Sequence, residues 1–389
     1  MQKALVSFSR LPDFALWNKL EGRRIPLSFD LEATARCNNN CRHCYINLPP
    51  GDKAALHDEL TLDEISHIAD QAVSLGTLWC LITGGEPLIR EDFLDLYKLL
   101  KKKGLLVSVF TNACLITEKH IKLFRDYPPR DIEITVYGAT EETYERVTRM
   151  PGSYAAFRHG LDQLLEGGIK LDLKTMALRS NVHELPAIAR FCRERTENFF
   201  RFDPILQLRF DGNEPRNREI RVERLSTEEI IGIEQADPER SAAMEKRCGM
   251  LETALPEEGQ NQRLFQCNAG GESFAVGYNG LFRLCPSLWQ RDCLYDLRRG
   301  MLAEAWFDFV PRVLARTSTN HEFLERCRIC PLMNQCQWCP AHAHLECGRM
   351  DERCEYFCRV AHARAEAFGN NVKKKIIGPV SHPKPAKIL

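Results

Sequence analysis

A loop with three cysteines constrains this chain more than any other feature of the sequence. Cys37, Cys41 and Cys44 follow a strand-like apolar run, 25–33, in the spacing C-x3-C-x2-C. Three thiolates on one tight loop can hold three irons of a 4Fe–4S cube and leave the fourth iron open. An open iron is a reaction site, so the chain needs further residues that hold a reactant beside it.

The length and composition indicate a globular protein with two domains. The chain has 389 residues, beyond the size at which a single core usually stops growing. It carries 53 basic and 53 acidic residues, so its net charge gives no reason to expect nucleic acid as a partner. No apolar run approaches the roughly 20 residues that span a membrane, and the start lacks the apolar core of a signal peptide. We expect a cytoplasmic protein without a membrane segment.

The seventeen cysteines favour metal ligation over disulfide bonds, because their number is odd and the chain is long and has no secretion signal. Ten of them lie in residues 264–368. Cys80, Cys114 and Cys192 stand alone in apolar or helical contexts, and we expect them to be buried as small hydrophobic residues.

Strand and helix patterns alternate about six times over residues 25–210. Short connections between such units predict parallel strands joined by crossover helices. Eight units would close a barrel, so six predict an α/β fold with a partial (β/α)6 TIM-like barrel. The expected strands are 26–33, 78–83, 105–110, 131–137, 171–177 and 202–210. The expected helices are 61–76, which begins with a Thr61–Glu64 capping box, then 91–103, 117–126, 140–149, 153–166 and 182–195.

Two further motifs follow strand ends, where parallel sheets bind their ligands. Gly84-Gly85-Glu86-Pro87 follows the second strand and Thr111-Asn112 follows the third. The glycines let the backbone approach a ligand, Glu86 offers a carboxylate for an ammonium group, and Asn112 can bind hydroxyls or a carboxylate. A molecule with amine, carboxylate and ribose groups would suit this edge, although Thr111-Asn112 is also a common turn signal.

The predicted organisation has five parts. A short N-terminal segment, 1–24, precedes the barrel core, 25–210, and a charged connecting region, 211–263, has one amphipathic helix near 227–235. A cysteine-rich domain with little regular structure, 264–368, precedes a flexible tail, 369–389.

The cysteine loop and the Gly84–Pro87 motif, at the ends of the first and second strands, resemble the radical S-adenosylmethionine (SAM) superfamily. The resemblance covers residues 25–210 by motif order. It implies that Cys37, Cys41 and Cys44 ligate a 4Fe–4S cluster, whose open iron binds the amine and carboxylate of SAM. It also implies reductive cleavage of SAM to a 5′-deoxyadenosyl radical, with an electron donor such as ferredoxin or flavodoxin.

The same resemblance implies additional contacts to SAM. His43 stands where relatives usually carry an aromatic residue near the adenine, and Thr111 and Asn112 match polar positions that contact SAM. Lys174 and Asn181 are further candidates of this kind. By its own chemistry, His43 can equally be a surface loop residue, Lys174 a solvated charge and Asn181 a helix cap.

The later cysteines resemble the SPASM extension, named for enzymes that mature subtilosin, pyrroloquinoline quinone, anaerobic sulfatases and mycofactocin. Residues 267–285 fit C-x12-G-x4-C, and residues 327–339 read C-x2-C-x5-C-x2-C, where the family often has three residues before the last cysteine. The resemblance implies two auxiliary 4Fe–4S clusters, although two close cysteine pairs also suit a zinc knuckle. The outer cluster would have a full set of ligands, Cys327, Cys330, Cys336 and Cys358; the near cluster would have three, Cys267, Cys285 and Cys339.

The fourth ligand of the near cluster stays open. Cys347, Cys293 or Cys248 completes it, or its fourth iron is free for a substrate group. Cys354 is an alternative to Cys358 in the outer cluster.

Two comparisons within the family bear on the substrate. Sulfatase-maturing relatives have an aspartate directly after the Gly-x4-Cys cysteine, whereas this chain has Pro286, which argues against that activity. Many peptide-modifying relatives begin with a leader-binding domain, for which residues 1–24 are too few, so a partner protein or the main body would hold a leader.

We therefore predict a radical SAM enzyme that modifies a peptide or protein side chain, for example by forming a crosslink. One alternative is modification of a small molecule or cofactor precursor. From another class, the chain could be a non-catalytic iron–sulfur electron carrier or a zinc scaffold. The Gly84–Pro87 motif argues against that class, because electron transfer needs no site for an amine.

Overall fold

The computed structural model describes residues 23–249, 262–333 and 335–369. Its centre is one nine-stranded sheet with the order β6-β5-β4-β3-β2-β1-β7-β8-β9. Strands β1 to β6 are parallel, β7 runs parallel to β1, and β8 and β9 are antiparallel. The bounds are β1 Ser28–Thr34, β2 Trp79–Gly84, β3 Leu106–Thr111, β4 Ile132–Thr135, β5 Asp172–Met176, β6 Arg201–Asp203, β7 Ser273–Val276, β8 Leu281–Arg283 and β9 Tyr295–Asp296. The predicted α/β fold with six parallel strand units is confirmed.

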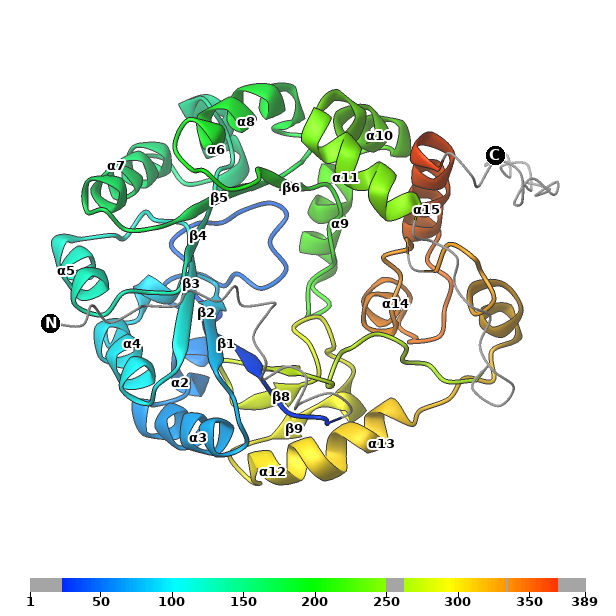
Figure 1. Cartoon of the computed structure of the whole chain (residues 1–389), viewed down its shortest axis with the longest axis horizontal. Helices are drawn as coiled ribbons and strands as arrows, with labels where there is room; N and C mark the ends of the chain where they lie inside the picture. The colour runs from blue at the N-terminus through cyan, green and yellow to red at the C-terminus, as the bar shows by residue number, and fades with distance from the viewer. Residues whose placement is uncertain (1–22, 250–261, 334, 370–389) are drawn as a thin grey trace, which may run out of the picture.

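Helices cover the outer face of this sheet (Figure 1). Helix α3, Leu62–Ser74, begins with the predicted capping box, in which Thr61 and Glu64 satisfy each other's backbone N–H groups. Ile65 and Ile68 on its inner face are buried against the sheet. The helices of this layer are α2 Lys53–Asp58, α3 Leu62–Ser74, α4 Phe93–Lys102, α5 Glu118–Asp126, α6 Glu141–Thr148, α7 Ser153–Glu166 and α8 Leu185–Arg193.

The sixth strand is shorter than predicted. It ends at Asp203 because Pro204 follows, and proline has no N–H group for a sheet ladder. The apolar pattern that continues to Phe210 reflects buried side chains without a strand, among them Leu206 and Leu208. This segment instead runs over the cysteine loop, where the Phe210 N–H donates to the carbonyl of Tyr45 at 3.3 Å.

The C-terminal half has more regular structure than predicted. Strand β7 extends the barrel sheet beside β1, and the rings of Phe29 and Phe274 stack across this junction with centroids 5.3 Å apart. The described part of the connecting region holds three helices where one was expected, namely α9 Glu214–Glu223, α10 Thr227–Ala236 and α11 Pro238–Gly249. Later in the chain follow α12 Leu302–Glu304, α13 Val310–Leu314, α14 Pro340–Cys347 and α15 Glu355–Phe368. Helix α10 packs on α15.

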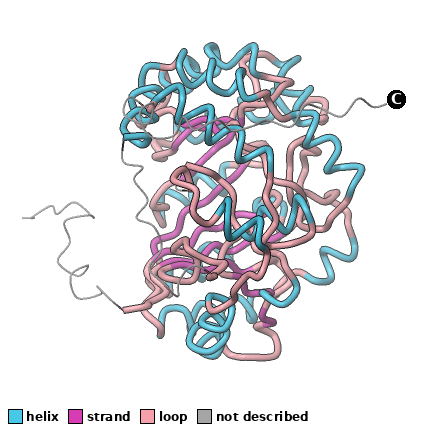
Figure 2. Tube along the Cα trace, turned by 90° about the vertical axis from the view of Figure 1, so that its right-hand side faces the viewer, coloured by secondary structure: helices cyan, strands magenta, loops and turns pink. Residues whose placement is uncertain are grey.

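The strands lie inside the molecule, with helices above and below them (Figure 2). The carboxyl ends of β1, β2 and β3 therefore meet at one edge, which carries the three motifs that the sequence placed there. Cys80 and Cys192 are buried and Cys114 is half-buried. Residues 1–22, 250–261 and 370–389, which include most of the predicted N-terminal segment and tail, lie outside the described residues. Within the described ranges, no helix has the length and apolar character needed to cross a bilayer.

Candidate active site

The cysteine loop is held against the end of β1. The Cys37 N–H donates to the carbonyl of Leu48 at 2.9 Å, which closes the loop into one turn-rich segment. Backbone N–H groups donate to two of the thiols: Asn39 to Cys37 and Asn47 to Cys44, each at 3.4 Å. Burial and the neighbouring thiols raise the pKa of Cys37. Deprotonated thiolates here need a positive partner, and iron would supply one.

The three thiols do not converge on a single point. Among the residues that the structure describes, no group of three or more His, Cys, Asp or Glu side chains could hold one metal ion. In a 4Fe–4S cube the ligands bind different irons, so its thiolates need not converge.

The two glycines of the Gly84–Pro87 motif let two loops touch through their backbones. Gly84 has a φ of 130°, and a Cβ atom there would lie 2.2 Å from the carbonyl oxygen of Thr34. A Cβ atom on Gly85 would lie 2.3 Å from the carbonyl oxygen of Arg36. With glycine at both positions, Gly85 donates to Thr34 at 2.7 Å and Glu86 donates to Arg36 at 2.9 Å. The motif is therefore packed directly on the backbone that leads into Cys37.

The Glu86 carboxylate lies behind the pocket and binds the end of β3. It accepts hydrogen bonds from the Thr111 hydroxyl at 2.7 Å, the Asn112 N–H at 2.7 Å and the Leu88 N–H at 3.1 Å. Burial raises the pKa of Glu86 to about 7, although these three donors favour the carboxylate. Pro87 is also buried and begins a short 3₁₀ turn. In this structure Glu86 organises the ligand-binding edge and does not line the pocket.

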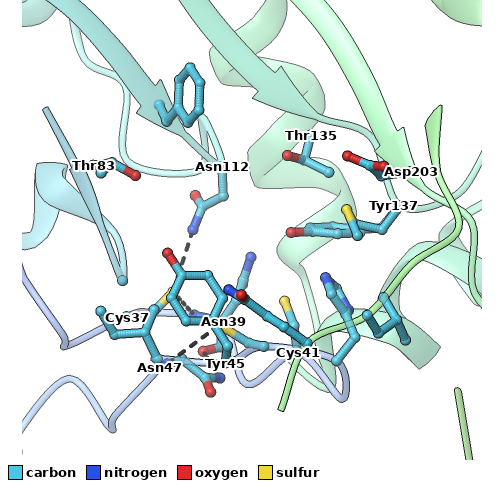
Figure 3. Close-up of a pocket in the computed structure, with 18 of the residues that line it drawn as sticks. Cys37, Asn39, Cys41, Tyr45, Asn47, Thr83, Asn112, Thr135, Tyr137 and Asp203 are labelled. Atoms are coloured by element: carbon cyan, nitrogen blue, oxygen red, sulfur yellow. Dashed lines mark hydrogen bonds between the residues drawn. The ribbon is translucent and has the colours of Figure 1, made fainter. Parts of the chain in front are cut away.

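Asn112 connects β3 to the cysteine loop. Its side-chain amide donates to Asn38 Oδ1 at 2.8 Å and lies 3.8 Å from Cys37 Sγ. Figure 3 shows Asn112 and Thr83 on one side of a pocket, with Thr135, Tyr137 and Asp203 on the other.

This pocket has a volume of about 420 Å³ and brings most of the predicted SAM residues together. Its lining includes nine of them: Cys37, Cys41, His43, Cys44, Gly84, Gly85, Thr111, Asn112 and Lys174. The His43 ring lies 5.2 Å from the ring of Tyr137, and burial lowers the pKa of His43 to about 4. The neutral imidazole can therefore face an adenine ring at neutral pH.

Lys174 and Asn181 differ in their placement. The Lys174 ammonium lies 4.0 Å from the centre of the Phe110 ring inside the pocket, and burial lowers its pKa to about 7. It also forms an ion pair with Glu133. Asn181 is fully buried outside the pocket lining, where its amide donates to the carbonyls of Tyr137 and Met176 at 3.0 Å and accepts from Leu178 at 2.8 Å. It stabilises the loop after β5.

Sequence reasoning missed several residues of this site. Asn39 lines the pocket with a buried amide whose side-chain atoms have no partner among the described residues. Arg209 and Arg216 donate to backbone carbonyls of the cysteine loop, namely Cys44 at 3.3 Å and Cys41 at 2.9 Å. A lone asparagine in a polar loop and arginines more than 160 positions away carry no local signal of these contacts.

The C-terminal cysteines include two groups of neighbouring thiols. Cys285 is within electrostatic range of Cys339 and Cys267. In the outer set, burial and the neighbouring thiols of Cys358, Cys330 and Cys327 raise the pKa of Cys336 to about 12. His342 and Gln337 connect the near set to the pocket, because both line it and the His342 N–H donates to Cys339 Sγ at 3.4 Å.

The three open candidates for the near set lie in different surroundings. Cys248 is buried and contacts the carbonyl of Arg364 at 3.7 Å. Cys293 is buried and accepts from the Arg316 guanidinium at 3.4 Å. Cys347 lies 3.7 Å from Cys354.

The family match covers the first five strand units and the helices between them. Residues 31–192 match the radical SAM superfamily. An AdoMet-dependent heme synthase of Methanosarcina barkeri is 29% identical over 42% of this chain and 46% of its own length. A PqqA peptide cyclase of Bradyrhizobium diazoefficiens is 28% identical over 42% of each chain. The chain thus matches about half the length of these curated relatives.

Solved structures extend the likeness to most of the chain. Native anSMEcpe with bound AdoMet has a TM-score of 0.62 over 90% of this chain and 98% of that chain, at 14% identity. Streptococcus suis SuiB bound to its precursor peptide SuiA has a TM-score of 0.60 over 88% and 78%, at 16% identity. At these identities the likeness establishes the fold.

The chain therefore contains a domain of the radical SAM superfamily, identified by the cysteine loop and by the family match over residues 31–192. Its cysteine-rich C-terminal part is consistent with a SPASM domain within that superfamily. Membership implies a 4Fe–4S cluster and SAM as cofactors. The residues present fit both, since two of the three loop thiols accept backbone N–H groups and all three line one pocket.

Proposed function

We propose that this enzyme modifies a side chain of a peptide or protein. The observation that carries the proposal is the pocket, which the cysteine loop and the C-terminal residues Gln337 and His342 line together. A substrate held by the C-terminal half would thus reach the SAM site directly. SuiB with its precursor peptide and anSMEcpe with a Cp18Cys peptide share this fold and contain peptides, which supports a peptide substrate.

In this proposal the residues of the pocket have separate roles. Cys37, Cys41 and Cys44 hold the cluster, and when SAM is bound the two cofactors together supply a 5′-deoxyadenosyl radical that removes a hydrogen atom from the substrate. Gly84, Gly85, Thr111, Asn112 and Lys174 line the SAM site with backbone edges and polar groups, and His43 faces the adenine. Glu86 positions Thr111 and Asn112 through its hydrogen bonds.

We further propose two auxiliary 4Fe–4S clusters. The outer one is held by Cys327, Cys330, Cys336 and Cys358. The near one is held by Cys267, Cys285 and Cys339, with its fourth iron open toward the substrate. A cytoplasmic ferredoxin or flavodoxin would donate electrons, and a partner protein or the main body of this chain would hold the leader of a ribosomal peptide.

A second function is favoured by the sequence relatives. The AdoMet-dependent heme synthase and a probable GTP 3′,8-cyclase of Methanococcus maripaludis, 28% identical over 44% of this chain, act by name on small molecules. Modification of a small molecule or cofactor precursor is therefore the alternative.

Two measurements test these proposals. The protein is reconstituted anaerobically, reduced with dithionite and mixed with SAM, and 5′-deoxyadenosine is quantified. About twelve irons per chain would support three cubes, whereas about four would remove the auxiliary clusters. A Cys41→Ala variant should form no 5′-deoxyadenosine, and absence of that product from the wild type would refute radical chemistry.

The substrate class is tested by isotope transfer. Deuterated peptides from short reading frames found beside the gene are offered in one set of reactions, and an iron porphyrin or GTP in parallel reactions. Deuterium in 5′-deoxyadenosine from the peptide supports the proposal. Transfer from a small molecule alone would replace it with the alternative.

A further inference from the structure

Two cysteines near the outer set lie close together without a role in the function proposed so far. Cys347 is the last residue of α14, and Cys354 is the residue just before α15. Their sulfur atoms are 3.7 Å apart. Cys347 is exposed and Cys354 is buried, so one thiol of the pair can be reached from solvent.

The proposed outer set supplies four thiols, the number that a 4Fe–4S cube needs, without this pair. Cys327 interacts electrostatically with Cys358 and Cys330, and Cys336 interacts with all three of them. Burial and then the Cys347 thiol raise the pKa of Cys354, and Glu346 and Cys336 contribute less. The pair is therefore adjacent to the outer set, and its two members are each other's main partners.

The segment between the two cysteines is held in place. Gly348 has a φ of 77° and turns the chain at the end of α14. The carbonyl of Glu352 accepts from the Trp338 indole at 2.7 Å, and the Asp351 carboxylate accepts from the Ser318 hydroxyl at 2.8 Å. These contacts keep both sulfur atoms on the same side of a short loop.

We propose that Cys347 and Cys354 are an oxidisable thiol pair that closes to a disulfide beside the outer cluster and ligates no iron. Closure needs the sulfurs to move from 3.7 Å to about 2.05 Å. With glutathione disulfide as oxidant, the Cys347 thiolate attacks it and releases one glutathione. The Cys354 thiolate then attacks the mixed disulfide and releases the second glutathione. In total the two thiols lose two protons and two electrons. Glutathione disulfide takes up these protons and electrons and becomes two molecules of glutathione.

The position of the pair gives this modification a consequence. Helix α14 begins at Cys339 of the near set, and α15 carries Cys358 of the outer set. A disulfide between the end of one helix and the start of the next would join the supports of both sets covalently. Reversible disulfides in reducing compartments are usually redox sensors, and this location would let an oxidant act on the auxiliary region.

The test uses the full-length, cluster-loaded protein. It is incubated anaerobically with excess glutathione disulfide for several hours, because burial raises the pKa of both thiols and slows exchange. Free thiols are then alkylated and the protein is digested with trypsin. Trypsin cleaves after Arg349 and Arg353, between the two cysteines, so the disulfide should join two separate peptides.

Three variants complete the test. Cys354→Ser should keep the iron content of the wild type and gain a glutathione adduct at the exposed Cys347. Cys347→Ser should keep its iron and form no joined peptide. Cys192→Ser, which removes a buried cysteine far from this loop in the sequence, should behave as the wild type.

Two outcomes would overturn the inference. Loss of about four irons in Cys354→Ser or Cys347→Ser would make that residue a cluster ligand. Absence of the joined peptides in oxidised wild type would show that the pair does not close. Neither outcome touches the proposed radical chemistry, because 5′-deoxyadenosine formation is measured separately.

Discussion

Replacement of Arg209 by glutamine should change both the stability of the protein and the reduction potential of the radical SAM cluster. The Arg209 side chain is 2% exposed. It donates to the carbonyls of Cys44 at 3.3 Å and Asn47 at 3.2 Å, to Asn47 Oδ1 at 3.0 Å, and to the Asp211 carboxylate at 2.7 Å. Because the Asn47 N–H donates to Cys44 Sγ, Arg209 positions a group that touches a ligating sulfur.

Order-of-magnitude estimates give the size of both effects. Breaking a buried ion pair typically costs about 3–5 kcal/mol. Asp211 keeps 29% of its side chain in solvent and can be hydrated, which places the expected loss at the lower end, about 3 kcal/mol. For the potential, one unit charge acting across about 10 Å at an effective dielectric constant of about 20 is worth ~1.7 kcal/mol. This equals about 70 mV for a one-electron couple. Loss of the positive charge should make the cluster harder to reduce.

The assay is a redox titration followed by electron paramagnetic resonance, with iron content and urea unfolding measured on the same samples. Arg209→Gln should move the potential of the SAM cluster to more negative values, while Arg209→Lys should keep the potential and lose stability. The matched control is Arg221→Gln, on the same helix as Arg216 and 38% exposed, which should change neither quantity. An unchanged potential in an iron-replete Arg209→Gln protein would refute the electrostatic reasoning.

Three further changes have defined outcomes. Gly85→Ala should abolish iron binding or folding, measured by iron content and circular dichroism, because its Cβ would lie 2.3 Å from the Arg36 carbonyl oxygen. Glu86→Gln should lower the free energy of unfolding by about 1–3 kcal/mol, because the new NH₂ group must face one of three hydrogen-bond donors. Equal urea midpoints for the variant and the wild type would contradict this. Burial raises the pKa of Asp30 to about 6, so the folded state binds more protons than the unfolded state between about pH 4 and 6. The stability of the wild type should therefore fall as pH rises through that window. The free energy of unfolding of Asp30→Asn should exceed that of the wild type by up to about 3 kcal/mol at pH 7.5 and equal it at pH 4, which urea unfolding would show.

Local sequence patterns predicted most of the barrel because each pattern acts within a few residues. The Thr61–Glu64 capping box and the helix 153–166 appear in the structure with the predicted residues. The cysteine loop and the Gly84–Pro87 motif meet because parallel strands bring their carboxyl ends to one edge. In these cases the cause of the observed structure lies either within the segment itself or in the parallel sheet that alternating strands and helices form.

The predictions were wrong where distant partners decide the structure. The segment 204–210 has the composition of a strand, but Pro204 ends the ladder, and the segment binds the cysteine loop through Phe210 and Arg209. The motif around Glu86 was placed correctly, yet its carboxylate turns to Thr111 and Asn112, because buried donors there need an acceptor. A single sequence indicates where a polar residue lies along the chain and says little about which distant group it satisfies.

The relative placement of the two cysteine regions depends on such a distant pair. Glu32 on β1 forms an ion pair with Arg283 on β8, both side chains are fully buried, and the pair spans 251 positions of sequence. Strand β7 lies between them in the sheet. Arg283 also stacks 3.6 Å from the centre of the Trp289 ring. A buried ion pair adds little net stability, but loss of one partner is costly, so the pair penalises other arrangements of the two strands. Because β1 leads into Cys37 and β8 into Cys285, this pair fixes the radical SAM loop and the near auxiliary set relative to each other.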